Sequence, residues 1–181
     1  ISTNTDADFH VIVLGGQFYN NQLWGISVRN YGTSTYTKKV SLIGVYCYNN
    51  TYDGILLQNV AEISLESVYC YQNRRAGILL DGCYNSTITN ALLFDNDRDD
   101  AESTWGNGIS IENSYYNTIS TVQCSNVEGS TQNYGIREYG GNNDYNIISN
   151  AICLGNSVMG IQLQGANSQV HLSYNGTSWI P

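Results

Sequence analysis

Apolar and polar residues alternate in many short runs along this chain. The runs Val40-x-Leu42 and Val45-x-Cys47 are followed by Gly54-Ile55-x-Leu57, and these three runs return along the sequence. Alternation over three to five residues is typical of short strands with one buried face. The Gly-Ile pairs begin at residues 25, 54, 77, 108, 135 and 160, so the unit repeats about every 25 residues. Three strands per unit and no helical stretch predict an all-β parallel β-helix, a solenoid with three parallel sheets.

The length of 181 residues predicts one domain over residues 1–181, with about six to seven coils spaced about 4.8 Å apart. Its interior should consist of stacked side-chain columns. The isoleucines of the Gly-Ile pairs form one unbroken column: Ile26, Ile55, Ile78, Ile109, Ile136 and Ile161.

Asparagines recur three residues beyond the Phe, Cys or Leu of the second run, at Asn21, Asn50, Asn73, Asn96 and Asn156. Asparagine tolerates the left-handed conformation of a sharp corner, and its amide can bond to the amides above and below. We therefore predict a ladder of stacked amides, which Val127 interrupts in the fifth coil.

Four of the five cysteines, Cys47, Cys70, Cys124 and Cys153, fall in one inward column. We expect small buried apolar residues there, because in-register neighbours orient their Cβ atoms poorly for a disulfide. The column has no histidine and no CxxC spacing, so no metal site is predicted. Cys83 lies in a turn with no obvious partner.

The net charge of −8 argues against nucleic acid or an anionic membrane as a partner. No stretch is long and apolar enough to span a bilayer. The chain begins at Ile1 rather than at Met, which suggests processing or a longer parent chain. Because open coil ends expose strand edges, we expect either missing capping segments from such a parent or a homo-oligomer.

Two insertions, at residues 97–107 and 128–134, enter the Gly-Ile strand from the same corner. Insertions grouped on one face of a repeat protein often mark its working face. On that face, alternation places Asp81, Glu112 and Tyr139 in one outward column, with Arg137 one strand position away. The candidate substrate-binding residues are Trp105, Arg75, Asn107, Tyr139, Asp97 and Asp99.

These residue types suit a polysaccharide, because aromatic rings stack on sugars, acids and amides bond hydroxyls, and arginine binds carboxylates. For hydrolysis we expect Asp81 and Glu112 to be the carboxylate pair, with Asp53 and Arg137 positioning the substrate. For lyase chemistry Arg75 or Arg137 would take the C5 proton, and acidic residues would hold Ca²⁺ on the uronate. No other cofactor is predicted. Solvent exposure alone would also make these outward positions polar.

Glu138 stands in a column that is otherwise apolar. Because an unpaired inward carboxylate is costly, we expect a bulge or a shifted register at residues 137–141 that brings it out, which Gly140 and Gly141 would permit.

The sequence rhythm over residues 11–175 resembles the right-handed parallel β-helix superfamily of pectate lyases and polygalacturonases. Residues 50–55 are similar to the N-T-D-G-I segment of polygalacturonases, residues 106–111 to their G-H-G-I-S-I, and residues 135–137 to the start of their G-I-R-I-K. The resemblance implies roles for Asp53 and Arg137. The family's G-D-D stands here as Arg74-Arg75-Ala76, its His position is Asn107 and its Lys position is Tyr139.

A second resemblance is to mannuronan C5-epimerases, whose N-x-x-D-G, D-R-H-G and G-V-R-x-Y-G segments are echoed by residues 50–54, 74–77 and 135–140. Their D-P-H-E segment is absent. We therefore predict a right-handed parallel β-helix that binds a polysaccharide outside the cell or at its surface. If it is catalytic, the resemblance implies a glycosidase or a uronate lyase. The alternative is a non-catalytic structural, surface or tailspike-like segment.

Overall fold

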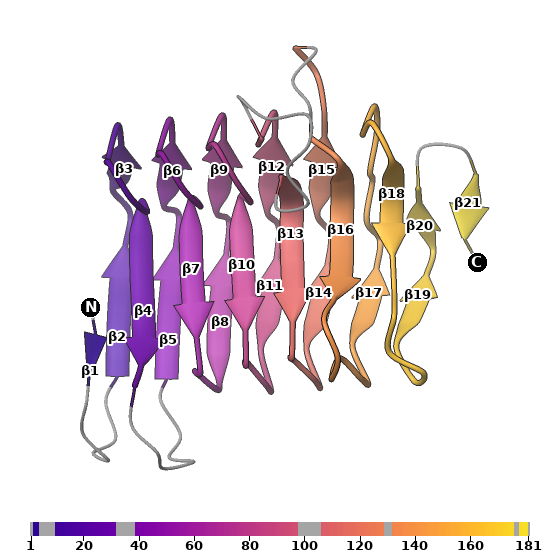
Figure 1. The fold of residues 1–181 in the computed structure, drawn as a ribbon, viewed down its shortest axis with the longest axis horizontal. Coiled ribbons are helices and arrows are strands. Elements are labelled where there is room, and N and C mark those ends of the chain that lie inside the picture. The colour runs from indigo at the N-terminus through magenta and orange to yellow at the C-terminus, as the bar shows by residue number, and fades with distance from the viewer. Residues whose placement is uncertain are drawn as a thin grey trace.

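The computed structural model describes residues 2–3, 10–31, 39–97, 106–128, 132–175 and 178–180 as a solenoid of stacked coils (Figure 1). The Gly-Ile sheet comprises, in order, β1 (Ser2–Thr3), β4 (Ile26–Asn30), β7 (Ile55–Gln58), β10 (Ile78–Asp81), β13 (Asn107–Glu112), β16 (Tyr134–Tyr139) and β18 (Met159–Gln162). No helix occurs in the described residues, so none there could cross a membrane.

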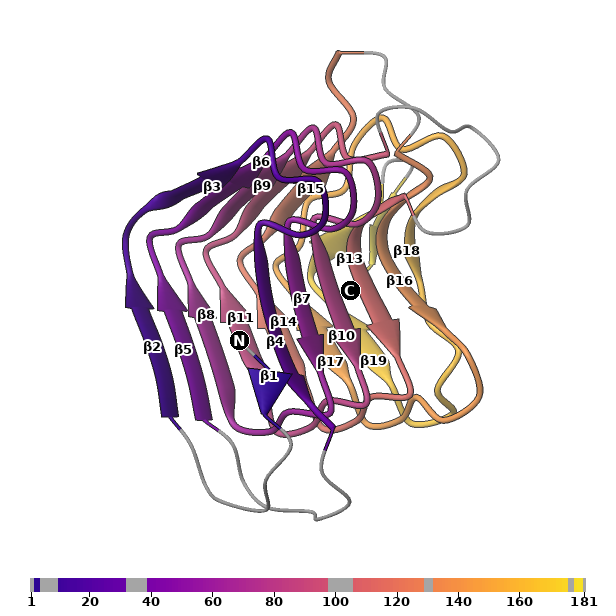
Figure 2. The same cartoon turned by 60° about the vertical axis from the view of Figure 1, so that its left-hand side comes forward.

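Two further parallel sheets complete the coils (Figure 2). The back sheet comprises β2 (His10–Leu14), β5 (Lys39–Ile43), β8 (Ile63–Glu66), β11 (Thr87–Thr89), β14 (Thr118–Ser120), β17 (Ile147–Ser149) and β19 (Gln169–His171). The tyrosine sheet comprises β3 (Gln17–Tyr19), β6 (Tyr46–Tyr48), β9 (Tyr69–Tyr71), β12 (Leu92–Phe94) and β15 (Gln123–Ser125). An antiparallel pair, β20 (Ser173–Tyr174) and β21 (Trp179–Ile180), follows.

The predicted fold is confirmed: the structure is an all-β parallel solenoid with three sheets. The isoleucines of the Gly-Ile pairs are in register on consecutive strands from β4 to β18. Because the tyrosine sheet has five strands, five coils contribute to all three sheets. The predicted six to seven coils were therefore slightly too many.

The glycine of each Gly-Ile pair is required by the close approach of neighbouring coils. A Cβ atom on Gly54 would lie 2.7 Å from the carbonyl oxygen of Gly77 and 2.8 Å from Nδ2 of Asn73. A Cβ atom on Gly77 would lie 2.8 Å from the carbonyl oxygen of Gly108. The repeat therefore keeps glycine because no larger residue fits inside this corner.

The predicted amide ladder exists, and it is longer than expected. Nδ2 of Asn50 donates to Oδ1 of Asn73 at 2.9 Å, and Asn73 donates in the same way to Asn96 at 3.0 Å. The predicted break at Val127 is wrong, because Gln132 supplies the missing rung. Its Oε1 accepts from Asn96 and its Nε2 donates to Asn156.

The corner conformation also differs from the prediction. The left-handed residue is the one before each of the first four ladder asparagines: Asn20, Asn49, Gln72 and Asp95, with φ between 52° and 54°. The ladder asparagines themselves do not have positive φ. One residue therefore turns the chain and the next bonds the coils together.

All five cysteines are buried free thiols. Cys47 pairs in register with Cys70, and Leu93 lies between Cys70 and Cys124, as the column predicts. Burial raises the pKa of the Cys70 thiol well above its ordinary value. Cys83 does have a partner, since its Sγ donates to the carbonyl oxygen of Leu57 at 3.2 Å, and burial raises its pKa to about 12.

The predicted outward bulge at Glu138 is wrong. Glu138 is in register with Ile111 and is fully buried. The side chains of Asn146 and Ser168 donate to Oε1 at 2.8 and 2.7 Å. The backbone N–H groups of Gln164 and Gly165 donate to Oε2 at 2.7 and 2.8 Å. These four donors replace water, so the carboxylate remains inside.

Candidate functional site

The outer face of the Gly-Ile sheet carries a row of polar side chains on consecutive strands. Gln58 on β7 is in register with Asp81 on β10, Asp81 with Glu112 on β13, and Glu112 with Tyr139 on β16. Alternation puts these residues on the outer face, because the residue before each of them is fully buried: Leu57, Leu80, Ile111 and Glu138. The two candidate acids are thus direct neighbours across the sheet.

The two acids have different hydrogen-bond partners. Nε2 of Gln58 donates to Oδ2 of Asp81 at 2.7 Å, and the hydroxyl of Tyr139 donates to Oε2 of Glu112 at 2.9 Å. Partial burial raises the pKa of Glu112, the Tyr139 bond opposes this shift, and the charge of Asp81 adds to it. Burial and the charge of Glu112 also raise the pKa of Tyr139, so its phenol keeps its proton. Two neighbouring carboxyls in unlike environments can act as an acid and a base.

Asp53 lies at the corner where the chain enters β7, and it is only 2% exposed. Nε1 of Trp24 donates to its Oδ2 and the backbone N–H of Ala76 donates to its Oδ1, both at 3.1 Å. Burial raises the pKa of Asp53 to about 6, although the Ala76 bond, the charge of Arg75 and the Trp24 bond oppose the shift. Asp53 therefore holds a proton near neutral pH more readily than an exposed aspartate.

Three arginines on this face stack on aromatic rings. Cζ of Arg29 lies 3.8 Å from the Trp24 ring centroid, and Cζ of Arg75 lies 4.3 Å from that of Tyr52. Such stacking holds a guanidinium in place while keeping its charge.

Arg137 is held between two tyrosines. Its Cζ lies 4.5 Å from the ring centroid of Tyr134 and 5.5 Å from that of Tyr139. Its Nε donates to Oε1 of Gln162 at 3.0 Å. The face thus combines carboxyls with arginines whose positions are fixed by neighbours.

The structure does not bring every predicted residue to this face. Asp97 and Asn107 are buried. Oδ2 of Asp97 accepts from Nδ2 of Asn133 at 3.3 Å, and Nδ2 of Asn107 donates to Oγ of Ser110 at 2.8 Å. Both therefore lie at the base of the first insertion. Asp99 and Trp105 lie outside the described residues.

Two aromatic residues of this face were not predicted from the sequence. Trp24 and Tyr52 lie just before the Gly-Ile pairs of their coils, with ring centroids 5.3 Å apart. Trp24 occupies the same position before glycine as Asp53, and this equivalence was the available signal. Among the described residues, no cluster of three or more His, Cys, Asp or Glu side chains could hold a metal ion.

Three solved structures share this fold at low sequence identity. An alginate lyase from Paenibacillus sp. str. FPU-7 is 15% identical, with a TM-score of 0.63, over 92% of this chain and 68% of the other. The mannuronan C-5 epimerase AlgE4 A-module from Azotobacter vinelandii is 19% identical, with a TM-score of 0.64, over 90% and 54%. The periplasmic alginate epimerase AlgG, as its T265N mutant, is 12% identical, with a TM-score of 0.68, over 96% and 43%.

These likenesses show the fold, and the chain spans only about half the length of the two epimerases. No curated protein matches the sequence. A family model described as a right handed beta helix region matches residues 4–175, which is nearly the whole chain. This protein therefore belongs to the right-handed β-helix family.

Proposed function

We propose that the outer face of the Gly-Ile sheet binds and hydrolyses an acidic polysaccharide outside the cell or at its surface. The observation that carries the proposal is the in-register pair Asp81 and Glu112, in which burial raises the pKa of Glu112. Three proteins of the same fold are named for alginate or mannuronan, which are polyuronates, and this supports the substrate class.

The spacing of the pair supports a two-step hydrolysis. The backbones of in-register positions on neighbouring strands lie about 4.8 Å apart, so the two side chains can bring their carboxyls to the separation of about 5 Å found in retaining glycosidases. Glu112 donates its proton to the glycosidic oxygen while the Asp81 carboxylate attacks the anomeric carbon, and the bond to the leaving sugar breaks. Water then hydrolyses the glycosyl ester, and Glu112 takes its proton as the base.

Arginines next to the pair supply recognition of the uronate. Arg137 and Arg75 are held by aromatic rings, and guanidinium groups bind carboxylates with paired hydrogen bonds. Asp53 holds the corner next to Arg75 by accepting from the backbone N–H of Ala76, and Tyr139 orients Glu112. Asp99 and Trp105 remain predicted sugar contacts of the first insertion, whereas Asp97 and Asn107 support that insertion from its base.

A second candidate is binding without cleavage. Both carboxyls already bond to side chains of the same row, and Arg74-Arg75-Ala76 replaces an acidic catalytic segment of the resembling hydrolases. Lyase chemistry, with an arginine as base and Ca²⁺ on the uronate, would use the same face and release unsaturated ends.

The test is a polysaccharide array read for binding, for new reducing ends and for unsaturated ends, with and without Ca²⁺. Glu112→Gln should retain binding and lose the release of reducing ends, because it removes the proton and keeps the shape. Glu66→Gln, on the exposed back sheet, is the matched control and should retain both. Release of unsaturated ends would show lyase chemistry instead of hydrolysis. Binding without release of any ends would support the second candidate, a protein that binds the polysaccharide without cleaving it. The assignment to this face fails if no glycan binds, or if Arg137→Ala leaves binding unchanged.

A further inference from the structure

The outer face of the tyrosine sheet carries a ladder of stacked aromatic rings. Tyr19 and Tyr48 have ring centroids 4.9 Å apart and planes 3° apart, and Tyr48 and Tyr71 have centroids 4.8 Å apart. Phe94 continues the stack at 5.5 Å from Tyr71. Each ring thus covers one face of the next, as in-register side chains on parallel strands can do.

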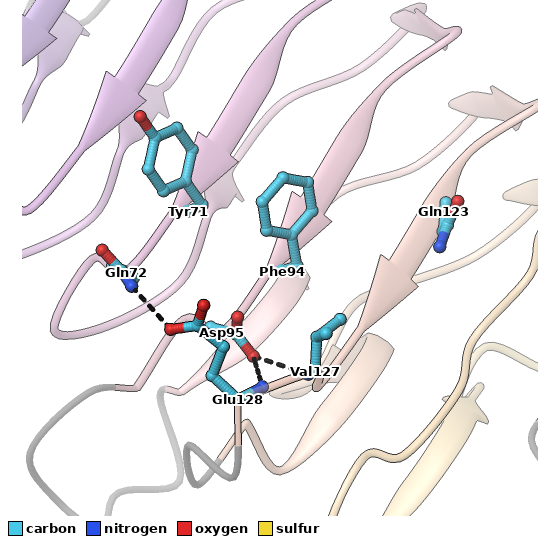
Figure 3. A pocket seen from close by; sticks show the side chains of 7 residues that line it. All are labelled: Tyr71, Gln72, Phe94, Asp95, Gln123, Val127 and Glu128. Carbon is cyan, nitrogen blue, oxygen red and sulfur yellow. Dashed lines mark hydrogen bonds between the residues drawn. The ribbon is translucent and has the colours of Figure 1, made fainter.

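The ladder stops because the next position is a serine. Phe94 is in register with Ser125 on β15, and a serine side chain is too short to cover an aromatic ring. A hollow of about 350 Å³ lies at this point, lined by Tyr71, Gln72, Phe94, Asp95, Gln123, Val127 and Glu128. Figure 3 shows Phe94 between Tyr71 and Gln123, with Asp95, Val127 and Glu128 along one edge. Ser125 itself is only 2% exposed, and its Oγ accepts from Nε2 of Gln123 at 3.4 Å. The hollow therefore lies beside Phe94, where the ladder of rings ends.

Acidic side chains edge this hollow. Oδ1 of Asp95 accepts from the backbone N–H groups of Val127 and Glu128, at 2.6 and 3.0 Å, which fixes the chain on that side. Oε2 of Glu128 accepts from Nε2 of Gln72 at 3.2 Å (Figure 3). Both charged lining residues are acidic, so an anionic ligand would be repelled.

We propose that the hollow binds one ring of a neutral sugar, which stacks on Phe94 in place of the missing aromatic rung. The C–H face of a pyranose can lie against an aromatic ring, and its hydroxyls can donate to the Glu128 carboxylate and bond the Gln123 amide. This site lies on a different sheet from the Asp81–Glu112 pair, and it prefers an uncharged sugar rather than an acidic one. It therefore stands whether or not the proposed hydrolysis is correct.

The test is a titration of ¹⁵N-labelled protein, which follows the side-chain amides of Gln72 and Gln123 and the backbone amide of Ser125. Cellotetraose, maltotetraose and mannotetraose are the neutral probes, and tetragalacturonate is the acidic one. At least one neutral probe should shift these signals at millimolar concentration, and tetragalacturonate should not.

Substitution of Ser125 gives the sharper result. Ser125→Tyr should lower the affinity for the neutral probe by about tenfold or more, because its ring continues the ladder over Phe94. Phe94→Tyr keeps the stacking face and should retain the affinity, as should Ser120→Tyr on the back sheet, the matched control. Thermal unfolding would verify that each variant is folded.

Three results of the sugar titrations would overturn the proposal: no neutral probe binds, tetragalacturonate shifts the same signals equally, or Ser125→Tyr binds as tightly as the original chain. Concentration-dependent shifts without sugar, together with dimers in sedimentation, would show that a second copy occupies the hollow and would also overturn it.

Discussion

Nε2 of Gln132 donates to Oδ1 of Asn156 at 2.7 Å, across a step of one coil. Oε1 of the same side chain accepts from the backbone N–H and from Nδ2 of Asn96. The glutamine thereby carries the amide ladder through the fifth coil, although the chain leaves the regular path after Cys124. An insertion at this corner does not interrupt the ladder.

Gln132→Ala should lower the free energy of unfolding by about 3 kcal/mol, because it leaves buried donors of Asn96 unpaired. Urea unfolding measures the change. Asn142→Ala, at an exposed amide, is the control and should change stability by less than about 0.5 kcal/mol. Equal effects of the two substitutions would show that the rung is not needed.

Gly77→Ala should destabilise the protein by about 1–3 kcal/mol, because the new Cβ meets the Gly108 carbonyl oxygen at 2.8 Å and the Leu93 side chain at 2.8 Å. Gly141→Ala is the matched control, since a Cβ there meets nothing within 4 Å. It should be neutral or stabilise slightly, because alanine restricts the unfolded chain. The two melting temperatures should therefore move apart, and a common shift would contradict the packing argument.

Asp53 should titrate with a midpoint near pH 6, visible in the indole N–H signal of Trp24, which donates to it. Its pKa is raised above the ordinary value of 3.8, so the protonated form favours the fold. This contribution of about 3 kcal/mol is fully present below about pH 4 and is lost as the pH rises through 6. Asp53→Asn should abolish the titration of the indole signal, whereas a midpoint near 4 would contradict the effect of burial.

Tyr139→Phe should raise the pKa of Glu112 further, because the lost hydrogen bond is the interaction that opposes the upward shift. Carbon-13 NMR of the Glu112 carboxyl measures this directly. Any limb of a pH–rate profile that reports Glu112 should also move to higher pH. Tyr134→Phe is the control: it removes only the hydroxyl of the ring that stacks on Arg137, so the pKa of Glu112 should not change.

The strands and their register could be predicted because alternation and the Gly-Ile pair mark the same positions in every coil. The same phase placed Asp81, Glu112 and Tyr139 on neighbouring strands. Gln132 was not predicted, because an insertion shifts the ladder position along the sequence. Counting three residues past Cys124 reaches Val127, whereas Gln132 occupies the ladder position in the structure.

Contacts between distant residues could not be read from alternation. The backbone and side-chain donors that keep Glu138 inside include groups 26 to 30 residues further along the chain. The burial of Asp97 and Asn107 depends on how the base of the first insertion folds. The end of the ring ladder at Ser125 could not be predicted either, because alternation does not show that the rings before it stack.

Glu138 changes how this end of the solenoid can unravel. Coils of a repeat protein usually fray one at a time, because each contacts only its neighbours. Here, peeling away residues 164–168 would strip three of the four donors from a carboxylate in the interior. Strand β16 and the segment at 164–168 should therefore open as one unit, and their amides should exchange with deuterium at a common rate. Glu138→Gln should uncouple them, since in either orientation the glutamine amide hydrogens face at least one N–H group that can only donate, either Nδ2 of Asn146 or the backbone of Gln164 and Gly165.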